Sequence, residues 1–200
     1  MPLLALGAFS LFLALAFGLR SAVHYRRTGT TGFVGISGRI GSAEWNGGAL
    51  FIVALLAGAA APVLQLAGWI AQWTTLDVAV IQILGAVLYL VGAAGALWAQ
   101  FAMGDAWRIG VDANERTTMV ATGPFRWVRN PIYSSMMAAT VGIALLVPNA
   151  LSAVAVLALV VGLELHVRLV EEPHLTRTHG EQYRRYAERT GRFVPGVGRL

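Results

Sequence analysis

The fold is decided by residues 123–133, GPFRWVRNPIY, which are followed later in the chain by residues 168–172, RLVEE. Between them lies an apolar run that is interrupted once, at Pro148-Asn149. Such a run is long enough for two short membrane-crossing helices and leaves no room for an aqueous domain. The run therefore folds back, and its two polar ends meet on the same side of a bilayer. We expect the arginines and aromatic side chains of the first stretch to face the carboxylates of the second, in a binding site at the membrane surface.

The composition is that of an integral membrane protein. Of the 200 residues, 56% are hydrophobic and 12% are charged, whereas about a quarter of the residues of an ordinary soluble domain are charged. The chain has no cysteine and no lysine, which excludes disulfides, thiolate zinc sites and Schiff-base chemistry. We expect an all-α, polytopic membrane helix bundle in one domain, with three spanning helices in residues 1–103 and a cofactor-binding catalytic half in residues 104–200.

The net charge of +5 has a topological explanation. Arginines follow the first, third and fifth apolar runs, and none lies between Arg39 and Arg108, a stretch that contains a complete crossing and return. This is the positive-inside pattern, so membrane lipids explain the basic charge and no nucleic-acid partner is needed. It predicts an outside N-terminus, an inside C-terminus and an active site that faces the cytoplasm, in the cytoplasmic (inner) membrane of a bacterium.

Five apolar runs predict about five transmembrane helices, over residues 1–19, 47–69, 78–103, 132–147 and 150–167. The first run has no positive charge before it, so we expect a retained span rather than a cleaved signal peptide. The last two are near the lower limit of about seventeen residues for a crossing, and they predict a tight C-terminal hairpin that stops short of the far surface. Residues 20–46 are expected to form a cytoplasmic loop. Residues 176–200 are expected to form a cytoplasmic tail with an amphipathic helix that ends before Pro195.

Charged side chains cluster at the end of the fifth run, where a charge at membrane depth requires a partner. Glu164, Arg168 and either Glu171 or Glu172 share one helical face at this spacing. Two interpretations remain open. The residues form either a structural ladder of ion pairs, or the polar floor of a site for a ligand that carries charges of both signs.

The opposite wall of such a site is expected from Arg129 and Tyr133. Pro131 keeps Asn130 out of helical geometry and starts the fourth span directly after it. The side chains on either side of this break then face the carboxylates at the end of the fifth span.

The sequence predicts neither a metal site nor a serine nucleophile. His174 and His179 are five residues apart, which is not one face of a helix, and there is no His-Glu-x-x-His pattern. Ser134 and Ser135 do not lie in a Gly-x-Ser-x-Gly motif, and small hydroxyl side chains are ordinary at the start of a helix.

A series of short motifs runs through residues 97–197. They are Gly123-Pro124-Phe125, Arg129-Asn130-Pro131-x-Tyr133, Glu171-Glu172, Gly180-Glu181-x-Tyr183-x-x-Tyr186 and Pro195-Gly196. Together they closely resemble the isoprenylcysteine carboxyl methyltransferase and phospholipid methyltransferase family of membrane enzymes. In the enzymes that the chain resembles, the C-terminal hairpin and tail enclose S-adenosylmethionine at the cytosolic side, and a lipidic acceptor enters sideways from the bilayer.

The resemblance implies roles for individual residues. The implied cofactor-binding residues are Gly123, Phe125, Arg129, Asn130, Pro131 and Tyr133 on one wall, and Glu171 and Glu172 on the other. The predicted catalytic residues are Arg168, which would hold a carboxylate of the acceptor or cofactor, and Glu164, which would orient Arg168 or take a proton; Glu171 is the alternative to Glu164 for this second role. Asn130 stands where the family usually has histidine, and Ser135 stands where a small glycine is frequent and is expected to narrow the cavity.

The predicted function is S-adenosylmethionine-dependent methyl transfer to a lipophilic acceptor, a carboxylate, thiol or amine, at the cytoplasmic membrane face. Such a transfer is an in-line displacement, in which the protein mainly holds donor and acceptor together and excludes water. Two alternatives remain. One is an NADPH-dependent enzyme similar to the membrane sterol reductases, which share an Arg-x-Pro-x-Tyr segment. The other is a non-catalytic membrane protein in which the pair of Glu164 and Arg168 is only structural.

Overall fold

The computed structural model describes residues 1–33, 35, 38–108 and 119–200. Helices make up 75% of the described residues, which contain no β-strand, so the all-α prediction is confirmed. Four helical stretches are long and apolar enough to cross a membrane: residues 2–28, 43–66, 79–102 and 150–179. A shorter apolar helix covers residues 131–146, and at about 1.5 Å per residue it is shorter than a bilayer core is thick.

The first three long stretches lie near their predicted positions. They consist of α1 (Pro2–Leu13), the π-helix η1 (Ala14–Leu19) and α2 (Arg20–Thr28); then α3 (Ala43–Leu66); then α4 (Ala79–Ala102). Short 3-10 turns follow α3 and α4 as η2 (Thr74–Leu76) and η3 (Gly104–Ala106). The first helix does not end near residue 19 as expected but continues to Thr28, so the first part of the predicted cytoplasmic loop is helical. Residues 34, 36 and 37 of that loop lie outside the described residues.

The C-terminal half begins with the 3-10 turn η4 (Gly123–Arg126) and continues as α5 (Pro131–Leu146) and α6 (Ala150–His166). The π-helix η5 (Val167–Glu171) then joins α6 to α7 (Glu172–His179) in one continuous stretch, which is followed by α8 (Glu181–Arg189). The fifth span is therefore not short, because it continues well beyond residue 167. The amphipathic tail helix is α8, and it ends at Arg189, before Pro195 as expected.

Local sequence signals explain several helix starts. Ser42 caps α3 by accepting a hydrogen bond from the Trp45 amide at 3.2 Å, and Asn149 caps α6 by accepting one from the Ser152 amide at 2.9 Å. Both are residue types that satisfy the free amides of a first helical turn. Pro131 occupies the first position of α5, where a missing amide hydrogen costs nothing.

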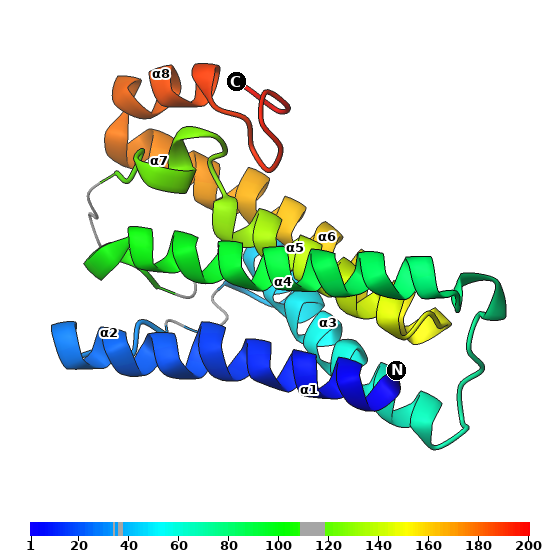
Figure 1. Cartoon of the computed structure of the whole chain (residues 1–200). Coiled ribbons are helices and arrows are strands. Elements are labelled where there is room, and N and C mark those ends of the chain that lie inside the picture. Colours follow the sequence, from blue (N-terminus) through cyan, green and yellow to red (C-terminus); the bar gives the residue numbers. More distant parts are fainter. Residues whose placement is uncertain (34, 36–37, 109–118) are drawn as a thin grey trace.

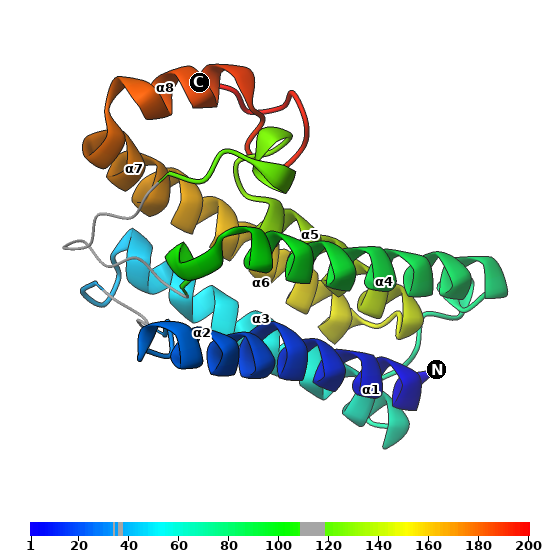
Figure 2. The ribbon, with the colours of Figure 1, turned by 60° about the vertical axis from the view of Figure 1, so that its left-hand side comes forward.

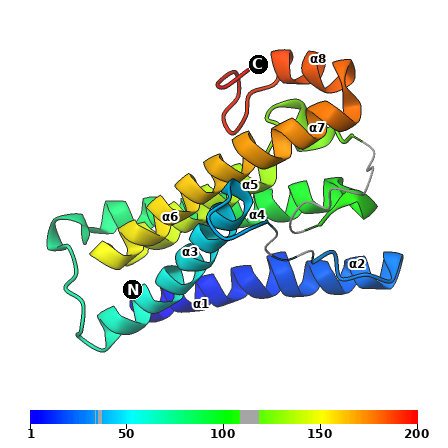
Figure 3. The same cartoon turned by 180° about the vertical axis from the view of Figure 1, so that it is seen from behind.

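Glycines allow two pairs of helices to pack closely. A Cβ atom at Gly92 of α4 would lie 2.6 Å from the Ser135 carbonyl oxygen of α5, and a Cβ at Gly142 of α5 would lie 2.6 Å from the Gly85 carbonyl oxygen. These glycines therefore let the backbones of α4 and α5 approach closely. In the second pair, a Cβ at Gly47 of α3 would lie 3.2 Å from the Gly162 carbonyl oxygen of α6. Helices α5 and α6 form the expected hairpin, but they pack mainly on α4 and α3 respectively (Figure 3).

The first helix is held against α4 by polar side chains. Gln100 donates to the Ala16 carbonyl at 3.0 Å, within η1, where the i→i+5 pattern of a π-helix leaves a carbonyl to be satisfied. Arg20 donates to the Gly104 carbonyl at 2.5 Å, and its guanidinium carbon lies 4.5 Å from the centre of the Trp107 ring. These contacts fix η1 as one wall of the polar end of the bundle.

One end of the bundle carries most of the polar structure. The end of α2, the end of α4 and α7 gather there (Figure 1), and the start of α3 lies beside them (Figure 2). Helix α8 and the C-terminal segment lie across the same end, above the start of α5 (Figure 2). The arrangement brings residues 123–133 and the end of the fifth span together, as the sequence predicts.

Candidate functional site

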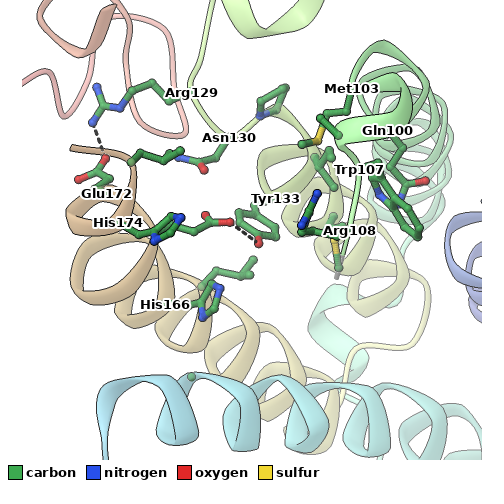
Figure 4. Close-up of a pocket in the computed structure, with 18 of the residues that line it drawn as sticks. Gln100, Met103, Trp107, Arg108, Arg129, Asn130, Tyr133, His166, Glu172 and His174 are labelled. Carbon is green, nitrogen blue, oxygen red and sulfur yellow. Dashed lines mark hydrogen bonds and ion pairs between the residues drawn. The ribbon is translucent and has the colours of Figure 1, made fainter. Parts of the chain in front are cut away.

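A cavity of about 400 Å³ lies inside this polar end, which is within the usual size range for small-molecule sites. Side chains reach it from α3, α4, α5, the α6–α7 stretch and α8. Figure 4 shows Asn130 and Tyr133 on one side, His166 and His174 on another, and Met103 and Trp107 on a third. Most of the contributing segments are far apart in sequence, so the cavity exists only once the tail has closed on the bundle.

Arg129 ties the C-terminal tail to the start of α5. Its guanidinium donates to the backbone carbonyls of Ala187 at 3.0 Å, Thr190 at 2.5 Å and Gly198 at 2.9 Å. The Arg129 amide also donates to the Gly191 carbonyl at 2.7 Å. A single buried side chain therefore satisfies three carbonyls that end α8 and the loop after it, which is the geometry expected of the multidentate arginine fork.

Glu172 is the buried ionic partner of two arginines. Its Oε1 accepts from Arg129 at 2.6 Å, and both carboxylate oxygens accept from Arg192 at 2.8 Å. The hydrogen bond from Arg192 to Glu172 raises the pKa of the Arg192 guanidinium. Gly191 makes this turn possible, because a Cβ there would lie 2.8 Å from the Gly196 amide nitrogen. Glu172 thus works as the centre of a network that closes the tail over the cavity.

Glu171 has a different environment although it is the next residue. Its Oε1 accepts a hydrogen bond from the Tyr133 hydroxyl at 3.1 Å, and no arginine pairs with it among the described residues. Its carboxylate lines the cavity and still has acceptor positions for a ligand. The predicted meeting of Tyr133 with the glutamate pair is therefore observed. The Glu172 carboxylate is paired with two arginines, whereas the Glu171 carboxylate faces the cavity.

The π-helix η5 explains why these carboxylates point inward. The Glu172 amide donates to the Val167 carbonyl, five residues back. In a regular α-helix, residues five apart point about 140° away from each other, so His166 and Glu171 would not share a face. A π-turn holds about one residue more, and both side chains line the cavity. Single π-turns of this kind are frequent at functional sites.

Two tyrosines of α8 complete the polar part of the cavity. Tyr183 and Tyr186 both line it, with ring centres 6.2 Å apart. The Tyr186 hydroxyl donates to the Phe125 carbonyl at 2.6 Å. Burial raises the pKa of Tyr186 to about 12, and burial followed by the charge of Glu172 raises the pKa of Tyr183. Both phenols therefore stay protonated at ordinary pH and present flat, partly apolar rings.

The lining changes character along each helix. Toward α8 it is polar, with Arg129, Asn130 and Glu171. Toward the middle of the bundle it becomes apolar, with the side chains of Phe17, Phe51, Ile52, Leu55, Met136 and Leu163. The cavity can therefore hold a charged ligand at one end and an aliphatic group at the other.

Seven of the ten predicted site residues lie in the cavity wall: Phe125, Arg129, Asn130, Pro131, Tyr133, Glu171 and Glu172. Gly123 does not; it is exposed in the turn that precedes Phe125, with a φ of +59° that favours glycine. Asn130 uses its amide to donate to the Arg192 carbonyl at 3.2 Å. Asn130 thus helps to hold the C-terminal tail in place. A side-chain amide is sufficient for this contact, and the histidine that is usual at this position in the family is not needed for it.

The structure does not bring Arg168 and Glu164 into the cavity. They pair with each other on the outside of the helix, where the Arg168 side chain is 57% exposed. The expectation that they share a face with Glu171 and Glu172 assumed regular α-helical spacing, and η5 breaks that spacing. Ser135 does not narrow the cavity either, because it packs against Gly92 and Gly95 of α4.

Sequence reasoning missed Arg192 as a partner of Glu172 and His166 as a cavity residue. Arg192 follows a glycine and precedes Pro195-Gly196, a combination of turn residues that signals a folded-back loop. Regular α-helical spacing does not place His166 on the same face as Glu171. Only the π-turn between them brings both side chains to the cavity. Among the described residues, no group of three His, Asp or Glu side chains is placed to hold a metal ion.

The residues present fit S-adenosylmethionine. The Nε atom of Arg129 is buried and has no hydrogen-bond partner, so it can donate to the carboxylate of an amino acid. Glu171 offers an anionic acceptor for an ammonium group or hydroxyls, and the tyrosine rings offer surfaces for an aromatic base.

Two comparisons with known proteins bear on this site. The sequence model of the phospholipid methyltransferase family matches residues 80–182, just over half of the chain. A search among curated proteins finds no match. The matched region runs from the start of α4 into α8 and includes each of the predicted cofactor and catalytic residues.

Proposed function

The chain belongs to the phospholipid methyltransferase family, and we propose that it transfers a methyl group from S-adenosylmethionine to a lipophilic acceptor. The four long apolar helices and the family make it an integral membrane methyltransferase. One observation carries the cofactor proposal. Arg129 forms an ion pair with Glu172, so that Glu171 is left without an arginine partner among the described residues and faces a cavity lined by tyrosines.

In this proposal the polar end of the cavity binds the cofactor. Arg129 Nε holds the carboxylate, Glu171 accepts hydrogen bonds from the ammonium group or the ribose, and the rings of Tyr183 and Tyr186 lie against the adenine. Bound S-adenosylmethionine supplies an electrophilic methyl group on a sulfonium. The task of the surrounding residues is to align donor and acceptor and to exclude water.

The apolar end is suited to the acceptor. Side chains such as Phe51, Ile52 and Leu55 of α3 line it, and large apolar side chains on the outside of the bundle indicate a lipid environment. We propose that the acceptor enters from the bilayer with its aliphatic part in this end. The basic residues at the polar end favour a cytoplasmic orientation in a bacterial inner membrane.

The charged side chains around the cavity suit S-adenosylmethionine better than NADPH. A phosphorylated dinucleotide requires cationic partners for its phosphates. Arg129 has only its Nε left for an anion, because its other two nitrogens form one ion pair and three backbone hydrogen bonds, and Arg192 is committed to Glu172. One donor suits a single carboxylate but not the several phosphates of a dinucleotide. The carboxylate of Glu171 would repel phosphates in the same space.

Calorimetric titration of the detergent-purified protein with S-adenosylmethionine, and separately with NADPH, tests the proposal. We expect saturable binding of S-adenosylmethionine alone. Glu171→Gln should weaken it by about tenfold or more, because a hydrogen bond to a charged group contributes about 1.5–3 kcal/mol. The matched Glu164→Gln, on the outside of the same helix, should bind as the native protein does. Binding of NADPH alone, or of neither ligand by a folded sample, would reject the proposal.

A further inference from the structure

His166 occupies a fixed position in the cavity wall. It is the last residue of α6, directly before the π-turn. The backbone of α3 lies against its base, since a Cβ at Gly47 would be 3.3 Å from the Cβ of His166. A larger residue at this position would have to shift its neighbours by a few tenths of an ångström. The histidine is thus held by the α3–α6 contact, while its ring borders the cavity (Figure 4).

The position of His166 coincides with the boundary between the two ends of the cavity. Along the α6–α7 stretch, Leu163 lines the apolar end and Glu171 lines the polar end, and His166 lies between them. Along α5, Tyr133 lies between Asn130 and Met136 in the same way. A donor in the polar end and an aliphatic acceptor in the apolar end must react where the two ends meet. That place is bordered by His166 and Tyr133.

The two side chains differ in what they can still bind. The Tyr133 hydroxyl already donates a hydrogen bond to Glu171. The ring of His166 has no hydrogen-bond partner among the residues that the structure describes. A neutral imidazole carries one nitrogen that accepts a proton, and it is the most frequent general base in enzymes.

We propose that His166 accepts the proton released by the methyl acceptor, whose reacting atom is therefore an amine nitrogen or a phenol oxygen rather than a carboxylate. The acceptor's lone pair forms the bond to the methyl carbon, and the carbon–sulfur bond breaks with its electron pair going to sulfur. The proton on the acceptor atom moves to the free imidazole nitrogen of His166. This inference rests on the proposed function, because it assumes the methyl donor in the polar end.

Methyl transfer in detergent micelles tests the role. Three probes are offered with S-adenosylmethionine labelled in its methyl group: dioleoylphosphatidylethanolamine as amine, 4-dodecylphenol as phenol and N-acetyl-S-farnesylcysteine as carboxylate. The proteins are the native chain, His166→Gln, His166→Ala and, as control, Arg185→Gln on the exposed face of α8. Calorimetry with S-adenosylmethionine on each sample separates binding from transfer.

We expect the amine or the phenol to be methylated, and His166→Gln to lower kcat by about 100-fold or more while the Kd for S-adenosylmethionine changes by less than about twofold. Added imidazole should restore part of the activity of His166→Ala and leave Arg185→Gln unaffected. A merely structural histidine would show no such rescue.

Three results would overturn the inference in a sample that binds S-adenosylmethionine. They are methylation of the carboxylate alone or of no probe, a kcat of His166→Gln within about threefold of native, and absence of imidazole rescue in His166→Ala. A native protein that does not bind S-adenosylmethionine would instead overturn the proposed function, and this inference with it.

Discussion

Two glutamates on one continuous helix pair with arginines in opposite environments. Glu172 is buried and pairs with Arg129, whose side chain is 2% exposed, whereas Glu164 pairs with Arg168, whose side chain is 57% exposed. A buried pair is costly to break because the remaining charge stays buried without compensation, but an exposed pair contributes little. Only the first pair has a geometry that matters for the cavity.

The backbone between the two pairs creates the difference. The π-helix η5 separates Glu164 from Glu172, and it turns the second glutamate inward while the first stays outside. Glu164 therefore forms a surface pair with Arg168, four residues away on its own helix, whereas Glu172 pairs with Arg129, 43 residues away in the chain. The comparison shows that ion pairs in a helical membrane protein have to be interpreted from the hydrogen-bond pattern of the backbone as well as from residue spacing.

The largest effect is expected from changing the register of the helix at the π-turn. The π-turn already holds about one residue more than a regular turn, so an alanine inserted after Leu169, which is 57% exposed, should rotate the following residues by about 100°. Glu171 and Glu172 would then leave the cavity, and binding of S-adenosylmethionine should be lost. Calorimetry measures the binding, and circular dichroism checks that helix content is kept. Native affinity in the insertion variant would show that the register of the π-turn does not orient the site.

Breaking the buried pair should have the next largest effect. Arg129→Gln removes one of the two arginine partners of Glu172 and also leaves the tail carbonyls of Ala187, Thr190 and Gly198 without their donor. Because buried acceptors without a donor are costly, the free energy of unfolding, measured by SDS titration of dodecylmaltoside micelles, should fall by about 3–5 kcal/mol. A decrease below about 1 kcal/mol would place this pair in the same class as the exposed one.

Removal of the second partner of Glu172 should cost less. Arg192→Gln leaves Glu172 paired with Arg129, so the buried carboxylate keeps a compensating charge. The same SDS titration should show a loss of about 1.5–3 kcal/mol, which is typical of a hydrogen bond to a charged group. An effect as large as that of Arg129→Gln would mean that Arg192, and not Arg129, carries the network.

The exposed pair should show the smallest effect. Arg168→Gln should change the free energy of unfolding by no more than about 0.5 kcal/mol and leave the affinity for S-adenosylmethionine unchanged. Both quantities are measured as for the other variants. A loss of binding in Arg168→Gln, with folding intact, would return Arg168 to the site from which the structure separates it.

Residue patterns predicted the helices and the meeting of residues 123–133 with the glutamate pair, and the family resemblance pointed to seven residues that line the cavity. These features depend on hydrophobic length, on arginine distribution and on proline at a helix start, all of which are visible in the sequence. The inward face of the glutamate pair depends on a backbone hydrogen bond from Glu172 to Val167, which has no side-chain signature. The role of Arg192 depends on how the last loop folds back, and only the glycines and the proline around it hinted at that turn.

The absence of cysteine in the chain permits the most direct test of the central claim, that S-adenosylmethionine binds in this cavity. Single cysteines are introduced as Leu175→Cys in the cavity wall and Arg168→Cys on the outer face, and maleimide labelling rates are measured with and without the cofactor. The account predicts that S-adenosylmethionine slows labelling at position 175 and leaves the rate at position 168 unchanged. Unchanged labelling at position 175, under conditions in which calorimetry shows saturation, would contradict it.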